Sequence, residues 1–225
     1  KVSKEKIIVR YGNKNEKFIT LDGVERKLKE DDLMICDGEN KPMCIAGVFG
    51  GENSGVTEET KTIFLESAFF NPSDIRKSSL NHGLKTDASY RFERGIDPNI
   101  TVFALKFASI LINKYCEGDV ISEIYDVYPK KIENRKIEID YERINNLIGQ
   151  DIDTKRINEI LALLDIKIEE KKNKILADVP PYRVDVTREA DIVEEILRVY
   201  GYNNIKTSSK NQSNFLSDES TGSYE

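Results

Sequence analysis

The sequence predicts an α+β protein with a mixed sheet-and-helix domain over residues 1–128 and a small winged-helix-like domain over residues 135–205. Short apolar segments separated by turn residues come first and predict strands. Two capped helical patterns and a hairpin pattern follow Pro129, which is the element order of a winged helix. Hydrophobic residues make up 39% of the 225 positions, enough to build a core.

The first domain begins with strand patterns. The segments "KIIVRYG" and "EKFITLDG" alternate apolar and polar residues and carry turn residues at Gly12-Asn13 and Asp22-Gly23. This is the pattern of antiparallel strands, so we expect a small sheet. Two short apolar strands are predicted next, on either side of the Asp-Gly-Glu-Asn turn at residues 37–40.

Helices follow in the second half of this domain. Asn71-Pro72 supplies the N-cap and first position of a short helix that ends near Gly83. Residues 83–98 show neither helical nor strand periodicity and predict a structured loop. Asp97-Pro98 then begins a long helix, which its apolar residues between 102 and 115 predict to be largely buried.

Glu66 interrupts an apolar run. Residues 62–70 otherwise read as a strand that is buried on both faces. An ionised carboxylate in such a strand loses hydration worth several kcal/mol unless a cation or hydrogen-bond donors replace it. Glu66 is therefore expected to be paired, protonated or functional.

The second domain has clear helix-capping signals. "IEID" predicts a strand, after which Asp140 caps a helix that Gly149 ends. Asp153 caps another helix, and residues 166–180 predict a hairpin with a charged turn.

The end of the chain carries a further helix and a polar tail. Val184 and Val186 predict a short strand, and Thr187 begins a helix that Gly201 ends. Residues 206–225 are rich in Ser and Asn and are predicted to be disordered. With Lys rather than Met at position 1, this tail suggests a piece of a longer chain.

Composition narrows the function classes. The chain has 34 Lys and Arg and 40 Asp and Glu, which gives a net charge of −6. There is thus no overall basic field that would indicate nucleic-acid binding. Any contact with RNA must be local or shared with a partner. Cys36, Cys44 and Cys116 lack CxxC spacing and lie among apolar residues, so we expect three buried thiols in a reducing cytoplasm. Neither a transmembrane stretch nor a signal peptide is present in the sequence, which predicts a cytoplasmic protein without membrane contact.

One group of residues predicts a small-molecule pocket. Gly47, Gly50 and Glu66 precede the segment 86–95, which holds Thr86 and Ala88. Small residues, a hydroxyl and a carboxylate are the ingredients of a specific binding pocket. The alternative stays open that Glu66 forms an ion pair with Arg91 or Arg94 and that the glycines serve tight turns.

His82, the single histidine, lies beside Gly83 at a helix end, where a capping role is expected. It offers no nucleophile-and-base arrangement, so no catalytic residue is assigned.

A carboxylate cluster marks the last helix. Asp191, Glu194 and Glu195 share one helical side, with Asp185 just before them, while Ile192 and its apolar neighbours are expected on the other side. Oxygen ligands of this kind suit a hard cation such as magnesium, and the alternative is a solvated helix face.

Two long stretches carry a family resemblance. The first is "AGVFGGENSGVTEETKTIFLESAFFNPSDIRKSSLNHGLKTDASYRFERGIDP", and the second runs from "RINNLIGQDI" to "VDVTREADIVEEILRVYGYNNI". They resemble the B3/B4 editing domain and the B5 domain of bacterial phenylalanine-tRNA ligase (phenylalanyl-tRNA synthetase) beta subunits, and the resemblance covers about residues 7–205.

The resemblance implies a function for the first domain. The family is an (αβ)2 enzyme that attaches phenylalanine to its tRNA with ATP and magnesium, and its B3/B4 domain hydrolyses tyrosyl-tRNA made in error. By this resemblance Glu66 accepts a hydrogen bond from the tyrosine phenol. Gly47, Gly50, Thr86 and Ala88 line the amino-acid pocket. A His-Ala-Phe-Asp stretch of the family has no counterpart in this chain, and His82 does not correspond to its histidine.

The resemblance also implies a partner and a metal. The carboxylates that match Asp185, Asp191, Glu194 and Glu195 bind magnesium where the beta subunit meets the alpha subunit. The competing hypothesis is a non-catalytic module that binds nucleic acid or assembles subunits.

Overall fold

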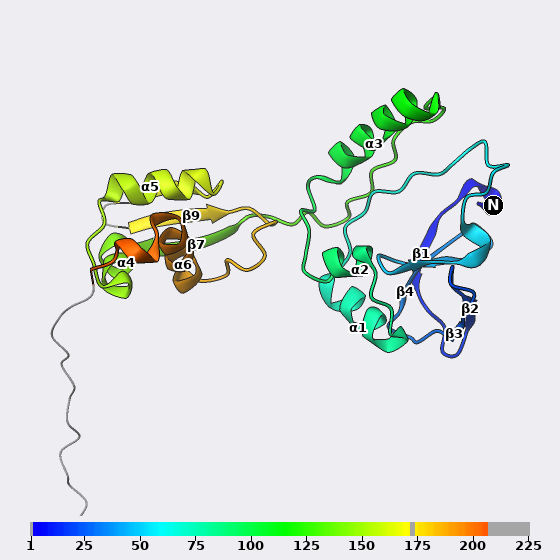
Figure 1. Cartoon of the computed structure of the whole chain (residues 1–225), viewed down its shortest axis with the longest axis horizontal. Helices are drawn as coiled ribbons and strands as arrows, with labels where there is room; N and C mark the ends of the chain where they lie inside the picture. The colour runs from blue at the N-terminus through cyan, green and yellow to red at the C-terminus, as the bar shows by residue number, and fades with distance from the viewer. Residues whose placement is uncertain (1, 172–173, 207–225) are drawn as a thin grey trace, which may run out of the picture. The chain divides into compact units, whose positions relative to one another are not determined.

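A computed structural model describes residues 2–171 and 174–206, and the chain divides into two compact units (Figure 1). The first unit comprises Lys1–Asn134 and Pro180–Asp185, and the second comprises Arg135–Val179 and Val186–Glu225. Both combine antiparallel strands with helices, so the predicted α+β class is confirmed. Of the polar tail predicted to be disordered, residues 207–225 lie outside the described residues.

The first unit is built around a four-stranded antiparallel sheet of order β1-β4-β5-β6 and a separate β2-β3 pair. Their bounds are β1 Ile8–Tyr11, β2 Lys17–Ile19, β3 Glu25–Lys27, β4 Leu33–Cys36, β5 Pro42–Ile45 and β6 Phe49–Gly50. The first two strands form where the alternation predicts them, but they lie in different sheets, because β1 pairs with β4 and β2 with β3. The turn between β4 and β5 is closed by Asp37, whose Oδ1 accepts from the backbone N–H groups of Glu39 and Lys41.

Three α-helices belong to this unit: α1 Pro72–His82, α2 Asp87–Phe92 and α3 Thr101–Cys116, with 3-10 turns at Ser3–Glu5 and Glu52–Ser54. The predicted cap of α1 is confirmed, since Asn71 Oδ1 accepts from Ser73 N at 2.9 Å and Gly83 is left-handed with φ +64°. This helix packs against α2 and β4 (Figure 1). The buried side chains Met34, Ile45 and Ile75 lie in the core of the unit.

The loop expected over residues 83–98 was wrong in one respect, because α2 forms within it. Thr86 is its N-cap: Thr86 Oγ1 accepts from Ser89 N at 3.0 Å, and Ser89 Oγ accepts from Thr86 N at 2.9 Å. A six-residue helix shows too few turns for periodicity to appear, so only this capping box predicts it.

The strand expected over residues 62–70 does not form. Residues 61–70 have no strand partner, and Ile63 and Phe64 are exposed. An apolar run forms a buried strand only when a neighbouring strand pairs with it, and this segment pairs with no strand of the β1-β4-β5-β6 sheet. Glu66 is exposed at this position, so the predicted burial within a strand is wrong.

The burial predicted for α3 is also wrong, because none of its residues is buried. Its start differs too. Asp97 Oδ1 accepts from Asn99 N, which forms a turn, and the helix begins at Thr101 after an N-cap, Ile100, that makes no side-chain cap.

The second unit has the predicted order of a strand, two helices, a hairpin and a last helix. Its sheet has the order β7-β9-β8. The bounds are β7 Arg135–Asp140, α4 Tyr141–Ile148, α5 Thr154–Leu163, β8 Lys167–Lys171, β9 Lys174–Val179, α6 Glu189–Tyr200 and a 3-10 turn at Tyr202–Asn204. Residues 172–173 of the hairpin turn lie outside the described residues.

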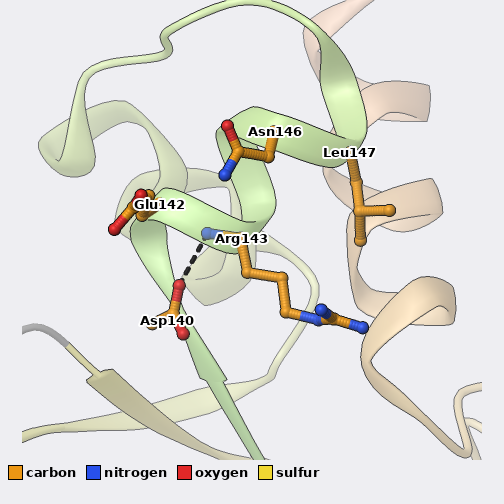
Figure 2. Close-up of a pocket in the computed structure, with 5 residues that line it drawn as sticks. All are labelled: Asp140, Glu142, Arg143, Asn146 and Leu147. Atoms are coloured by element: carbon orange, nitrogen blue, oxygen red, sulfur yellow. Dashed lines mark hydrogen bonds between the residues drawn. The ribbon is translucent and has the colours of Figure 1, made fainter.

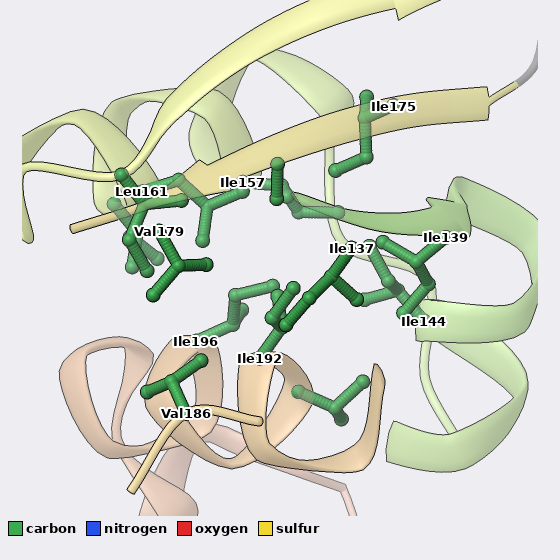
Figure 3. Packing of buried hydrophobic residues seen from close by; sticks show 14 of the residues in the cluster. Ile137, Ile139, Ile144, Ile157, Leu161, Ile175, Val179, Val186, Ile192 and Ile196 are labelled. Atoms are coloured by element: carbon green, nitrogen blue, oxygen red, sulfur yellow. The ribbon is translucent and has the colours of Figure 1, made fainter. Parts of the chain in front are cut away.

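The caps and the core of this unit agree with the sequence. Asp140 and Asp153 cap α4 and α5 through their side chains, and Gly149 ends α4 in the left-handed region. In Figure 3, Ile192 and Ile196 of α6 point toward the sheet, where Ile137 and the other apolar side chains form one buried cluster.

Two local expectations near α6 are corrected. No strand forms at Val184 and Val186, although Val186 is buried in the core of the second unit. The helix begins at Glu189 rather than Thr187, because Thr187 and Arg188 bind the side chain of Asp191.

The thiols and the histidine also differ from expectation. Cys36 is buried, Cys44 is half-buried and Cys116 is exposed, so the prediction of three buried thiols holds for one of them. His82 is no surface cap, because its Nε2 lies 2.7 Å from Asp32 Oδ2 and the two side chains are only 5% and 0% exposed. No helix among the described residues is both long and apolar enough to cross a membrane.

Candidate functional site

The β5-β6 hairpin is the frame of the candidate pocket. Cys44 pairs with Gly50 across the hairpin, and Ile45 with Phe49, which leaves a turn at residues 46–48. In this turn Gly47 has φ +65°, and a Cβ there would lie 2.9 Å from Phe70 Cδ2 and from Ile75 Cδ1. Packing therefore requires glycine at position 47, because the backbone lies directly against the apolar core.

Gly50 is approached closely from outside the hairpin. A Cβ at this position would lie 2.9 Å from Leu21 Cδ1, and Leu21 N donates to Gly50 O at 3.0 Å. Leu21 is itself exposed. A larger residue at position 50 would displace the end of a flexible side chain instead of filling a void.

Thr86 connects the start of α2 to the hairpin turn. Its Oγ1 donates to Val48 O at 2.8 Å while it accepts from Ser89 N. Both roles of the hydroxyl are used, so Thr86 fixes α2 against the hairpin. Ala88 follows on the first turn of α2 and is exposed, so its methyl group leaves the adjoining space open.

Glu66 acts electrostatically on Cys44 of the hairpin. Burial raises the pKa of the Cys44 thiol to about 12, and the nearby negative charge of Glu66 adds to that shift. Surrounding protein atoms also raise the pKa of the Glu66 carboxyl by desolvation, although the residue as a whole is exposed. Together, the raised pKa and the exposure describe a carboxyl group that is partly surrounded by protein atoms and still reaches solvent.

The ion pair considered for Glu66 is not formed. Arg94 instead contacts Glu93 Oε1 at 2.9 Å and Tyr90 O at 2.8 Å, and its guanidinium lies over the Tyr90 ring. Within residues 2–171 and 174–206, Glu66 makes no ion pair or side-chain hydrogen bond. The carboxyl is therefore available to a ligand.

The hairpin thus places most of the predicted pocket residues on one frame. Glu66 acts electrostatically on Cys44, which pairs with Gly50, and Thr86 donates to Val48 O in the hairpin turn. Cys44 was missed as a neighbour of the pocket. Its position opposite Gly50 could have been found only by predicting the hairpin register.

The predicted metal ligands on α6 are engaged by the protein. Asp191 Oδ2 accepts from Thr187 N, Thr187 Oγ1 and Arg188 N, and Asp191 Oδ1 contacts Arg188 Nε. The hydrogen bond from the Thr187 backbone is the main cause that lowers the pKa of Asp191 to about 2. This carboxylate holds the first turn of the helix.

The other three carboxylates lie in different surroundings. Glu195 is buried and pairs with Arg198 at 2.6 Å, so it does not share a solvated side with the exposed Glu194. Asp185 is exposed and belongs to the first unit. No group of three or more His, Cys, Asp or Glu side chains in the described parts of the chain could hold a metal ion. The residues present do not fit a magnesium site as they stand.

A cavity of about 320 Å³ in the second unit was not predicted from the sequence (Figure 2). It is lined by Asp140, Glu142, Arg143, Asn146 and Leu147. Asp140 caps Arg143 N at 2.6 Å, and the Arg143 guanidinium pairs with Glu189. Because the arginine is already neutralised, the cavity has no free cation for an anionic ligand.

The sequence matches two known domain families in order. Residues 1–117 match the family described as B3/4 domain, and residues 137–202 match the tRNA synthetase B5 domain.

Curated relatives match nearly the whole of this chain. The phenylalanine--tRNA ligase beta subunit of Bacteroides fragilis is 49% identical over 207 residues, which cover 92% of this chain and 25% of that protein. The protein of the same name from Carboxydothermus hydrogenoformans is 44% identical over 204 residues, or 91% of this chain and 25% of that protein. The chain spans about a quarter of the length of these curated relatives.

A solved N-terminal fragment of the phenylalanyl-tRNA synthetase beta subunit from Pyrococcus horikoshii superposes with a TM-score of 0.47 at 16% identity, over 88% of this chain and 57% of that chain. The assignment rests on the sequence matches, which cover more than half of the residues with the first domain alone. The chain belongs to the B3/4 domain family and continues into a tRNA synthetase B5 domain, so its resemblance to phenylalanine-tRNA ligase beta subunits is confirmed.

Proposed function

We propose that the first unit is the editing part of a phenylalanine-tRNA ligase beta subunit and hydrolyses tyrosyl-tRNA made in error. The whole enzyme would attach phenylalanine to its tRNA with ATP, in the cytoplasm, as an assembly of alpha and beta subunits that binds phenylalanine tRNA. The names of the relatives support the ligase. The observation that carries the editing function is the unpaired carboxyl of Glu66 at the β5-β6 hairpin.

Selection of tyrosine by Glu66 has a direct physical basis. A synthetic pocket shaped for phenylalanine rejects an added hydroxyl poorly, whereas a site that hydrogen-bonds this hydroxyl discriminates by about 10⁴ to 10⁵. The tyrosine phenol would donate to the Glu66 carboxylate. Phenylalanine would cover the same carboxylate without supplying a donor, which is unfavourable.

The neighbouring residues would shape the rest of the pocket. Gly47 and Gly50 hold the hairpin against the apolar core and Leu21, and Thr86 fixes α2 beside the hairpin. Ala88 would leave room for the aromatic ring. In the reaction, a water oxygen attacks the ester carbonyl carbon, the bond to the ribose oxygen breaks, and that oxygen leaves with a proton. No side chain of this chain is assigned to activate the water.

Two parts of the proposal concern the second unit. The carboxylates Asp185, Asp191, Glu194 and Glu195 stay a predicted magnesium set, and no step of the hydrolysis involves them. A module that only binds nucleic acid or another subunit is the alternative for this unit, and the net charge of −6 gives that version no electrostatic support.

The test is deacylation of tyrosyl-tRNA by the assembled ligase with Glu66→Ala. Loss of a charged acceptor is expected to lower discrimination about 10- to 150-fold, which corresponds to roughly 1.5 to 3 kcal/mol, while phenylalanine attachment stays nearly unchanged. The matched control is Glu59→Ala, which removes an exposed carboxylate from the same stretch of chain. Normal clearance of tyrosyl-tRNA by the Glu66→Ala enzyme would show that Glu66 does not read the phenol.

A further inference from the structure

Helix α2 has one side in the core of the first unit and one side open to solvent. Ser89 is 2% exposed, and the half-buried Phe92 packs against the apolar cluster of that unit. The side chains on the other side, called the open face here, are all exposed: Asp87, Ala88, Tyr90 and Arg91. Ala88, proposed above to leave room for the aromatic ring of the ligand, therefore belongs to a longer surface that solvent reaches.

An aromatic ring is held in place on the open face. Arg94, in the turn after α2, lies over the ring of Tyr90, with 3.6 Å between the guanidinium carbon and the ring centroid. Arg94 Nη1 also donates to Tyr90 O at 2.8 Å and to Glu93 Oε1 at 2.9 Å. Tyr90 is still 60% exposed, because the guanidinium covers only one side of the ring. A ring fixed in this way loses little rotamer freedom when a second planar group stacks on its free side.

A cation lies between this ring and Ala88. At about 100° per residue around a helix, Arg91 falls between Ala88 and Tyr90, and residues three apart have Cβ atoms about 5 to 6 Å apart. Arg91 makes no ion pair or side-chain hydrogen bond in the described parts of the chain, although Asp87 lies one turn before it. A planar guanidinium with free N–H groups is well suited to bind phosphate.

The local charge is opposite to that of the whole chain. Residues 72–94, which include α1 and α2, carry five Lys and Arg and three Asp and Glu, for a net charge of +2 in a chain of net charge −6. Composition requires any RNA contact to be local, and this segment meets that condition.

We propose that the open face of α2 binds the single-stranded 3′ end of the aminoacyl-tRNA, with a base stacked on Tyr90 and a phosphate held by Arg91. The proposal rests on the editing function, in which an ester joins tyrosine to the ribose of the last nucleotide. When the tyrosine ring lies against Ala88, that ribose is only a few bonds away, so the RNA must leave the pocket across the residues beside it. Unpaired bases stack on tyrosine and on guanidinium planes in this way.

An acidic protein segment would fit the same face less well. A carboxylate could pair with Arg91, but it would make no use of the fixed ring of Tyr90. A nucleotide supplies both a planar base and an anionic phosphate, so it matches the ring and the cation together.

The first experiment measures whether RNA covers the open face in the assembled ligase. The enzyme carries Cys116→Ser and Asp87→Cys, which leaves Tyr90 and Arg91 intact, and Lys155→Cys at an exposed position on α5 is the control. The probe is phenylalanine tRNA that carries tyrosine through an amide bond, which is not hydrolysed as the ester is. The rate of maleimide labelling is measured at each introduced thiol with and without this tRNA.

We expect the tRNA to slow labelling at position 87 at least about fivefold and to leave position 155 unchanged. Fast labelling at position 87 that the tRNA does not alter would overturn the proposal. Slow labelling at position 87 that is the same with and without the tRNA would assign the open face to a protein segment of the assembly, and it would overturn the proposal as well.

The phosphate contact has its own signature in the clearance of tyrosyl-tRNA. Arg91→Ala is expected to lower kcat/KM at least about fivefold and to make the slope of log kcat/KM against log salt concentration shallower by about 0.7. Arg91→Lys keeps the charge and should restore most of the slope. The matched control is Lys106→Ala, which removes an exposed cation from α3 and should change kcat/KM less than about twofold. An unchanged slope in Arg91→Ala would exclude the phosphate contact.

The stacked base has a different signature. Tyr90→Ala should lower kcat/KM about 5- to 150-fold without changing the salt slope, whereas Tyr90→Phe should stay close to wild type. Clearance at the wild-type rate by Tyr90→Ala would exclude stacking. If the wild-type ligase clears no tyrosyl-tRNA, the editing function is rejected, and the labelling of position 87 still decides whether RNA crosses α2. Loss of clearance in Glu66→Ala with normal clearance in Arg91→Ala and Tyr90→Ala would reject this proposal alone.

Discussion

The His82–Asp32 pair makes a strong prediction about the stability of the first unit. His82 Nε2 lies 2.7 Å from Asp32 Oδ2, and Lys29 N donates to the same oxygen at 2.7 Å. Asp32 Oδ1 is buried and has no hydrogen-bond partner among the described residues. Asp32 therefore depends mainly on His82, with a smaller contribution from the Ser78 side chain, and the His82–Asp32 pair joins the end of α1 to the turn before β4.

Removal of His82 should be costly. In His82→Leu the carboxylate stays buried with the Lys29 backbone donor and the Ser78 side chain, and breaking a buried pair in this way costs about 3 to 5 kcal/mol. Asp32→Asn keeps an acceptor for Lys29 N and removes the charge, so about 1 to 2 kcal/mol is expected. Because both changes remove the same interaction, the double variant should cost less than the sum of the two.

The assay uses the native thiols. Cys36 is fully buried in the first unit and Cys116 is exposed, so labelling of Cys36 reports opening of the unit and Cys116 serves as the reference. When opening is fast and reversible, 3 to 5 kcal/mol corresponds to labelling that is faster by about two to three and a half powers of ten. The control is Glu25→Gln, which breaks the exposed Lys17–Glu25 pair and should change the rate less than about threefold.

Labelling of Cys36 at the wild-type rate in His82→Leu would refute this reasoning. It would mean that the histidine adds nothing to a carboxylate that water or other groups already satisfy. A double variant whose cost equals the sum of the two single variants would show that His82 and Asp32 act independently.

Three further predictions follow from the same structure. Burial raises the pKa of Asp32, but hydrogen bonds from His82 and Lys29 outweigh burial and leave the pKa lowered. The free energy of unfolding should therefore fall as the pH drops below about 4, and it should fall less steeply in Asp32→Asn. Urea titrations followed by circular dichroism measure this difference. Asp191 has a pKa of about 2 in the folded chain, so Asp191→Ala should lower the melting temperature of the second unit at pH 7. The difference in melting temperature from wild type should shrink between about pH 4 and 2. A difference that stays constant with pH would exclude the capping role. Gly47→Ala should speed the labelling of Cys36 more than Gly23→Ala does. Both glycines have positive φ, but only at position 47 would the new Cβ lie 2.9 Å from other side chains. Equal effects of the two substitutions would mean that backbone strain alone matters.

Local signals in the sequence predicted the helix ends well. Asn71, Asp140 and Asp153 each cap the helix that follows, because such a cap depends on a few adjacent residues. Strand partners were not predictable in the same way. β1 pairs with β4 across more than twenty intervening residues, and nothing in either segment specifies that choice.

Apolar periodicity was reliable where its partner lies in the same unit. Ile192 and Ile196 of α6 are buried as their spacing predicts, whereas the equally apolar α3 is not. Apolar periodicity predicts which face of a helix needs a packing partner, but it does not identify that partner. The candidate pocket follows the same rule: Glu66 and Thr86 were selected from the sequence, but Cys44 is recognised only from the hairpin register.

The exposure of Glu66 changes how its selectivity would arise. A carboxylate that was buried permanently would have to be stabilised in the free protein, and its partner would then compete with the ligand. Glu66 is instead exposed in the free chain, although neighbouring protein atoms raise the pKa of its carboxyl by desolvation. The further desolvation on ligand binding would fall on the bound state, where tyrosine would offset it with its hydroxyl and phenylalanine would not. An unpaired and partly solvated carboxyl is therefore the arrangement that lets the identity of the ligand determine the free energy of binding.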